Sequence, residues 1–195
     1  NGMIGLFRRQ RAKPVKKGDI VILAGRPLAE LALRCSHERP ELIESVGGNP
    51  KYLRNAYTKI SAVESVAAML EVGTKRISLA GDNGIVKASK RISKEIKMGL
   101  MIDLDRIAWD EVGLKIARTF DGDPASATSY GAVIGILEKN DVDRKLDELS
   151  KRKISAYRIG TVTGGIGVWK SSGGPLTQHK DVYSLISPTP SFLLP

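Results

Sequence analysis

The sequence is poor in the residues that build disulfides and metal centres. Its 195 residues include one cysteine, Cys35, and two histidines, His37 and His179. A single cysteine excludes a disulfide within the chain and a cysteine-rich zinc site. A metal centre would therefore depend on carboxylates. No histidine pattern typical of a catalytic thiol surrounds Cys35, so we predict a small buried residue there.

Aromatic residues and long apolar runs are also scarce. Aromatics make up 5% of the chain, too few for the stacking platforms of proteins that bind single-stranded nucleic acid. No apolar run approaches the roughly 18 residues needed to cross a bilayer, and the N-terminal residues lack the apolar core of a signal peptide. With 42% hydrophobic and 27% charged residues, the composition is that of an ordinary globular domain. We expect a cytoplasmic protein without a membrane partner.

Acidic residues are absent from the first 17 positions, which carry six lysines and arginines. The chain as a whole has a net charge of +10, so the remaining residues carry only +4. Because the basic segment also contains Pro14, we interpret it as a linker. The alternative is an arm that binds nucleic-acid phosphates without specificity. A domain at +4 does not by itself indicate nucleic acid.

Short apolar runs alternate with helical patterns along the rest of the chain. Strands are expected at 19–24, 76–80, 100–104, 132–137 and 154–162, and helices at 27–35, 61–72, 85–98, 110–120 and 141–153. A turn at 163–165 leads into a short run at 166–169. Residues 36–57 resemble a polar loop, and 171–195 an irregular tail, docked through Phe192, Leu193 and Leu194. Strands that alternate with helices, together with two short strand-to-strand connections, predict a mixed sheet with helices packed on it.

The expected helix after residue 60 has a recognisable start and an apolar stripe. Ser61 and Glu64 have the spacing of a capping box. The apolar positions at helical spacing are Val63, Val66, Ala67 and Leu70. This spacing predicts that the stripe faces the core.

A tight turn of Gly81, Asp82, Asn83 and Gly84 leads from a strand into the lysine-rich helix 85–98. The first N–H groups of a helix form an anion site, which the lysines would strengthen. The alternative is that Asp82 or Asn83 caps the helix and occupies those donors. The turn matches neither common nucleotide-binding glycine motif, and its spacing alone favours capping.

Two aspartates, Asp103 and Asp105, alternate on an expected strand, so both carboxylates would project to the same side. Such a pair could bind Mg²⁺. We favour the alternative, in which Asp105 caps the next segment and Asp103 pairs with a neighbouring cation. The segment Asp121–Asp123 lacks the later ligands of a calcium loop, so we interpret it as a turn.

Hydroxyl groups gather in the loop before the expected strand 132–137. They belong to Ser126, Thr128, Ser129 and Tyr130. These groups could bind phosphate or ribose, or only the local backbone.

Four segments, taken in order, resemble the C-terminal domain of aminoimidazole ribonucleotide (AIR) synthetase and its relatives. They are KGDIVILAG at 17–25; ISLAG at 77–81 with GLMIDLD at 99–105; DP at 123–124 with SYG at 129–131; and ISAYRIGTVT at 154–163. Each segment is short, so their order over roughly residues 17–170 carries the resemblance. The family includes thiamine-monophosphate kinase, selenophosphate synthetase and the hydrogenase-maturation carbamoyl dehydratase.

The resemblance implies an α+β fold with a mixed sheet, of partly ferredoxin-like topology. It implies that residues 1–17 are the last strand, Met3–Phe7, and the basic linker of a missing N-terminal ATP-binding domain. Residues 18–170 would then form the AIR synthetase C-terminal-like domain, and 171–195 the tail. The maturation dehydratase ends in a catalytic cysteine, and this sequence ends in Pro195, so that activity is not expected.

The resemblance also implies a function and a site. The parent protein would be an ATP-dependent ligase or phosphotransferase, using ATP and Mg²⁺ on a phosphorylated or amide-like substrate. It would form a homodimer, and the present chain alone would be inactive. The implied phosphate- or substrate-binding residues are Gly81, Asp82, Asn83, Gly84, Ser129, Tyr130 and Gly131, with Asp82 nearest to Mg²⁺. A nucleic-acid partner is not expected. The alternatives are a basic module that binds RNA through 8–17 and 85–98, and an inactive scaffold of the same family.

Overall fold

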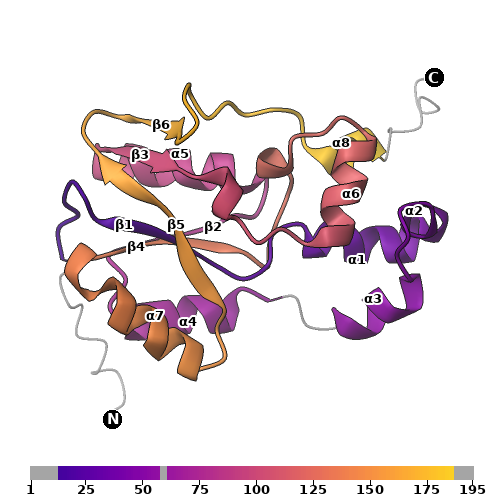
Figure 1. Ribbon diagram of the computed structural model, residues 1–195, viewed down its shortest axis with the longest axis horizontal. Helices are drawn as coiled ribbons and strands as arrows, with labels where there is room; N and C mark the ends of the chain where they lie inside the picture. The colour runs from indigo at the N-terminus through magenta and orange to yellow at the C-terminus, as the bar shows by residue number, and fades with distance from the viewer. Residues whose placement is uncertain (1–12, 58–60, 187–195) are drawn as a thin grey trace, which may run out of the picture.

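The computed structural model describes residues 13–57 and 61–186, which fold around one six-stranded sheet (Figure 1). The strands are β1 (Ile20–Ala24), β2 (Arg76–Leu79), β3 (Gly99–Ile102), β4 (Val133–Leu137), β5 (Ala156–Thr163) and β6 (Gly167–Lys170). Their order across the sheet is β2-β4-β1-β5-β3-β6. Neighbouring strands pair antiparallel except β3 and β6, which are parallel. The expected α+β fold with a mixed sheet is confirmed.

Helices cover both faces of the sheet because its central strands are apolar on both sides. All five residues of β1 and all five of β4 are buried. On one face, Val21 and Leu23 share a core with helix α5 (Gly84–Ile96). On the other face, Ile20 and Ile22 share a core with α4 (Val63–Glu71) and α7 (Val142–Lys151). Figure 1 shows α4 and α7 side by side below the strands.

The remaining helices gather at one end of the sheet and form a second body around a core of their own (Figure 1). They are α1 (Ala29–Glu38), α2 (Pro40–Ser45), α3 (Pro50–Ala56), α6 (Glu111–Thr119) and α8 (Val182–Ile186). Leu28, Ile43, Ile116 and Val182 are among the buried side chains that join them. Within the described ranges, no helix is both long enough and apolar enough to cross a membrane.

The interpretation of residues 36–57 as a loop is wrong, because α2 and α3 lie there. Each of these helices begins with a proline, Pro40 and Pro50, a residue that fits the first helical turn. The side chain of Asn49 caps α3 by accepting a hydrogen bond from the Tyr52 N–H at 3.0 Å. The helices have six and seven residues, too few for an apolar period to repeat.

The tail is only partly irregular. The backbone at Gly174 and Leu176 pairs with the outer edge of β6, where the Leu176 N–H donates to the Val168 carbonyl at 2.8 Å. Farther along, α8 packs against the helical body through Val182 and Ile186. The expected strand at Met3–Phe7 and the expected docking of Phe192–Leu194 lie outside the described residues.

The predicted stripe on α4 faces the core only at Val66, which is half-buried against it, and the prediction is wrong for Val63, Ala67 and Leu70, which are exposed. Val63 is 73% exposed and Leu70 62% exposed, whereas Ala68 and Met69 are buried. The capping box also does not form. The N-cap residue is Ala62, and Ser61 instead accepts a hydrogen bond from the Val63 N–H at 3.2 Å.

The prediction that Asp103 and Asp105 share a strand is wrong. Strand β3 ends at Ile102, and Asp103 caps a 3-10 turn over Leu104–Arg106 by accepting the Asp105 N–H at 3.2 Å. The other carboxylate oxygen of Asp103 lies 3.0 Å from Arg106 Nε. The alternative of a local ion pair is therefore confirmed, with Asp103 in the capping position that we assigned to Asp105.

Candidate functional site

The glycine turn after β2 and the hydroxyl-rich loop before β4 lie in contact. The carbonyl of Gly81 accepts hydrogen bonds from the N–H groups of Gly84 at 3.0 Å and Ser129 at 3.2 Å. The ring of Tyr130 lies over Gly81, where a Cβ atom would come within 2.9 Å of a ring carbon. The Tyr130 hydroxyl donates to Asp82, and this bond is the main reason that the pKa of Tyr130 is raised.

Helix α5 begins at this turn without a side-chain cap. Its N-cap residue, Asn83, has φ 60° and makes no capping hydrogen bond, and Asp82 is bonded to Tyr130 instead. The favoured capping interpretation is therefore wrong. A Cβ at Gly84 would lie 2.6 Å from the Ala125 carbonyl oxygen, so the helix end packs directly against a neighbouring backbone. Asp82 and Tyr130 are the exposed side chains at the turn.

The hydroxyl groups of Ser126, Thr128 and Ser129, in the loop before β4, all bind other groups of the protein. Ser129 is buried, and its Oγ accepts from the Leu28 N–H at 3.3 Å and donates to the Ala127 carbonyl at 3.2 Å. Ser126 and Thr128 donate to nearby carboxylates. The second of the two alternatives, binding to the local backbone, thus describes Ser129 only, whereas Ser126 and Thr128 bind side-chain carboxylates.

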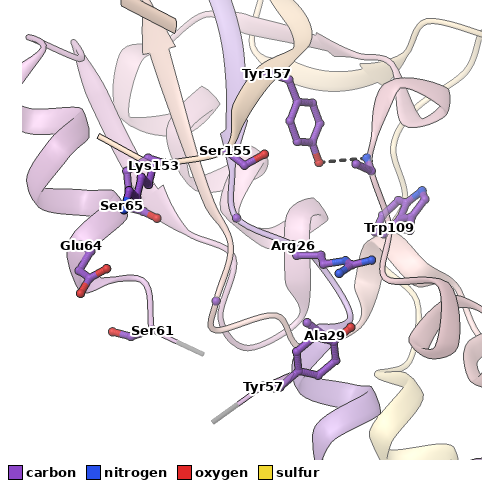
Figure 2. A pocket seen from close by; sticks show the side chains of 14 residues that line it. Arg26, Ala29, Tyr57, Ser61, Glu64, Ser65, Trp109, Lys153, Ser155 and Tyr157 are labelled. Carbon is purple, nitrogen blue, oxygen red and sulfur yellow. Dashed lines mark hydrogen bonds between the residues drawn. The ribbon is translucent and has the colours of Figure 1, made fainter. Parts of the chain in front are cut away.

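A cleft of about 600 Å³ opens beside this loop, between the sheet and the helical body (Figure 2). It is bordered by the chain after β1, the end of α3, the start of α4 and the segments that precede α6, β4 and β5. Its polar and aromatic lining residues are Arg26, Tyr57, Ser61, Glu64, Ser65, Trp109, Lys153, Ser155 and Tyr157. Gly131 also borders it, so the Ser129–Gly131 loop touches both the glycine turn and the cleft.

Three chain segments cross at the edge of the cleft. Gly25 follows β1 with φ +89°, and a Cβ there would overlap the carbonyl oxygen of Gly131. The Gly25 N–H donates to the Ser155 carbonyl at 3.0 Å. Only glycine permits both this φ value and this close approach to Gly131. The crossing therefore determines where the backbone of the next residue, Arg26, lies.

A buried carboxylate organises one wall of the cleft. Asp110 is 1% exposed, and its Oδ1 caps α6 by accepting the Gly113 N–H at 2.9 Å. Its Oδ2 accepts the Tyr57 hydroxyl and lies 3.4 Å from Arg26 Nε. Burial, followed by the bond to Asp110, raises the pKa of Tyr57 to about 12. The Arg26 side chain is 58% exposed and has no other polar partner in the described ranges, so its terminal nitrogens remain available.

Sequence reasoning missed these cleft residues. Asp110 stood only at the start of an expected helix, and Gly25 and Arg26 only in the short turn between the expected strand 19–24 and the expected helix 27–35. The turn itself was the signal that could have identified Arg26. Arg26 is a charged residue that directly follows a buried strand and stands between Gly25 and Pro27, and this context restricts where its backbone can lie. The partners Tyr57 and Asp110 come from other elements, and their position follows from tertiary packing.

Sulfur and imidazole groups take no part in the cleft. Cys35 is buried in the helical body, where burial raises its pKa to about 11, as expected for a core residue. His37 and His179 are exposed, and His37 lies in α1. Over residues 13–57 and 61–186, no three histidine, cysteine, aspartate or glutamate side chains lie together as a metal site would require.

Comparison with known proteins agrees with the fold. E. coli HypE matches with a TM-score of 0.69 and 17% identity, over 92% of this chain and 54% of the HypE chain. Thiamine-monophosphate kinase from Stenotrophomonas maltophilia matches with a TM-score of 0.62 and 13% identity, over 85% of this chain and 54% of the kinase. T. maritima PurL, solved in complex with ATP, matches with a TM-score of 0.52 and 12% identity, over 89% of this chain and 26% of PurL.

This chain spans about half the length of HypE and the kinase. No curated protein sequence matches it significantly. The family model described as AIR synthase related protein, C-terminal domain, matches residues 16–169. The chain therefore belongs to the AIR synthase related family and contains its C-terminal domain.

Proposed function

We propose that this chain is the substrate-side part of an ATP-dependent enzyme of the AIR synthase related family. In this proposal a phosphorylated or amide-like compound binds in the cleft, beside the glycine turn of Gly81–Gly84 and the loop of Ser129–Gly131. The observation that carries the proposal is the guanidinium of Arg26, which lines the cleft, lies 3.4 Å from Asp110 through Nε and has its terminal nitrogens available. Solved relatives of this fold, HypE and PurL, have been seen in complex with ATP.

Arg26 is suited to an anionic group. A guanidinium presents paired donors in a planar fork that match phosphate or carboxylate oxygens. The contact of Arg26 with Asp110 involves only Nε of the guanidinium, at 3.4 Å, and leaves its two terminal nitrogens available. Lys153, also in the lining, adds an exposed amine that makes no ion pair in the described part of the chain. The terminal nitrogens of Arg26 and the amine of Lys153 can each donate a hydrogen bond to an anionic group.

The other lining groups suit the remainder of such a ligand. Trp109 and Tyr157 offer flat apolar surfaces, and the Tyr157 hydroxyl is fixed by accepting the Ala108 N–H at 3.0 Å. Ser155 offers a hydroxyl, and the exposed Glu64 offers an acceptor for amide N–H groups. This combination of a few polar groups with apolar walls is typical of small-molecule sites.

The described residues do not form a complete site for ATP and Mg²⁺. Asp82 is the one carboxylate at the glycine turn, and it already accepts the Tyr130 hydroxyl. We therefore propose that the parent protein's other part holds most of the nucleotide and metal, and that Asp82 supplies at most one ligand. Phosphoryl transfer needs nucleotide, metal and acceptor positioned together, so we expect no turnover by this chain alone.

The test measures binding of ribose 5-phosphate, inorganic phosphate and glycinamide by the fluorescence of Trp109, in a Trp169→Phe background. We expect Arg26→Gln to weaken binding of the phosphate compounds about 10- to 100-fold, since a hydrogen bond to a charged group contributes about 1.5–3 kcal/mol. Arg118→Gln is the matched control, because Arg118 is exposed and lies on α6 away from the cleft lining.

Equal affinity of the Arg26→Gln and Arg118→Gln proteins for every compound would contradict the proposed site. ATP hydrolysis by the chain alone, at the roughly 1–1,000 s⁻¹ typical of enzymes, would contradict its assignment as one part of a larger enzyme. Circular dichroism of both variants checks that the fold is intact.

A further inference from the structure

The net charge of the domain is concentrated on one helix. Residues 18–195 carry +4 in total. The segment 84–97, which is α5 and its C-cap residue, carries +4 by itself, because it contains five cations and one acid, Glu95. The rest of residues 18–195 is therefore neutral. The five cations are Lys87, Lys90, Arg91, Lys94 and Lys97, and we call them the basic face of α5.

All five cations of the basic face are exposed. In the part of the chain that the structure describes, none of their side chains makes an ion pair, and the one side-chain hydrogen bond joins Arg91 to Ser78 at 3.3 Å. Every aspartate and glutamate of the sequence lies within that part, so no acidic side chain outside it is available to neutralise the face. Elsewhere many charges are paired, as for Lys75 with Asp19 at 2.8 Å.

The basic face has the dimensions of a polymer-binding surface. At 3.6 residues per turn, its members fall within an arc of about 120° on one side of the helix. The opposite side, including Ile85 and Ile92, is buried against the sheet. The 13 residues of α5 extend over about 20 Å. One small anion cannot span this length, whereas one strand of a duplex presents about six phosphates over it, at roughly 3.4 Å each.

The chemistry of the face selects among possible partners. Protein interfaces are depleted in lysine and have apolar centres, but no exposed residue of α5 is apolar. A membrane-surface helix inserts an apolar face, but that face of α5 is covered by the sheet. Lysine is a point charge suited to phosphates in any arrangement. We propose that the basic face of α5 binds the phosphate backbone of nucleic acid without reading its sequence.

The test uses the full chain and short DNA and RNA duplexes of one sequence, with affinity measured by fluorescence anisotropy between about 50 and 200 mM salt. The variant Lys87→Gln, Lys90→Gln, Lys94→Gln removes three charges from the face. The matched control Lys51→Gln, Lys139→Gln, Lys180→Gln removes three exposed lysines from elsewhere. Both proteins keep the basic residues 8–17, so their difference reports α5 alone.

Affinity falls as salt rises, and we expect the slope of log affinity against log salt to become shallower by about 0.9 for each α5 lysine removed. In the control protein the slope should change little. Preference for the DNA or the RNA duplex then identifies the natural polymer. Undetectable binding at low salt, or equal slopes in the variant and the control, would overturn the proposal. Stronger binding of poly-L-glutamate than of either duplex would also overturn it, in favour of an acidic protein partner. The cleft and ATP do not enter this test, so it is independent of the proposed function.

Discussion

Single residues decide whether the edge of the cleft can form. Gly25 and Gly131 are far apart in the sequence, yet their backbones touch beside Arg26. The sequence shows a turn at Gly25 but gives no indication of its contact, because that contact depends on the pairing of β1 with β4. Positions of this kind combine a left-handed backbone with a close approach, and only glycine satisfies both conditions.

We expect Gly25→Ala to be strongly destabilising. Gly25 has φ +89°, and the new Cβ would overlap the Gly131 carbonyl oxygen, so the backbone has to move. Strain of this kind, added to an overlap with backbone, should cost about 3 kcal/mol or more of unfolding free energy. Urea denaturation followed by circular dichroism measures the loss.

Gly47→Ala is the matched control for that experiment. Gly47 has φ +77°, but no atom lies within 4 Å of the position its Cβ would take. Only the left-handed strain remains, about 1–2 kcal/mol. If the two variants lost similar amounts of unfolding free energy, the contact between Gly25 and Gly131 would not be what makes a side chain at position 25 unfavourable.

At the scale of the element, strongly patterned segments were predictable and weakly patterned ones were not. Strand β4 is a continuous apolar run and α5 has one apolar face, and both form as expected. By contrast, α4 has apolar residues around most of its circumference, so periodicity could not identify the buried side. Packing on the sheet selects Ala68 and Met69. The short α2 escaped prediction because a single helical turn and a half shows no period.

The orientation of α4 can be tested with two neighbouring residues. Met69 is fully buried in the core between α4 and the sheet, and Leu70 is 62% exposed. We expect Met69→Ala to cost about 2–5 kcal/mol of unfolding free energy. Leu70→Ala should change it by less than about 0.5 kcal/mol. The reverse ranking in urea denaturation would mean that the stripe predicted from the sequence faces the core.

In the whole molecule, Asp110 joins the helical body to the end of the sheet. It caps α6, bonds Tyr57 at the end of α3 and lies beside Arg26 after β1. The family resemblance grouped the glycine turn with the loop containing Ser129, and the two are in contact because they adjoin the paired strands β2 and β4. The cleft could not be predicted from the sequence, because its lining residues come from segments that only the complete fold brings together.

This junction should make stability depend on alkaline pH through Tyr57. Its pKa is about 12 in the folded protein, against an ordinary value of 10.0. Below pH 10 both states keep the phenol proton, so the full contribution of the Tyr57–Asp110 bond is present. As the pH rises through this window, the unfolded chain loses the proton first, and the folded state is progressively destabilised relative to it.

Tyr57→Phe isolates that effect from the other groups that titrate at high pH. At neutral pH the substitution should lower the unfolding free energy by about 1–3 kcal/mol, because Asp110 loses a hydrogen bond. The difference between the wild-type and Tyr57→Phe proteins should then shrink as the pH rises from 10 to 12, the window between the two pKa values of Tyr57. Tyr52→Phe, at a tyrosine that is 68% exposed, should change the unfolding free energy at neutral pH by less than about 0.5 kcal/mol. A Tyr57→Phe difference that stays constant through the window would mean that burial and Asp110 do not hold the phenol proton, and that the helical body and the sheet are joined without this bond.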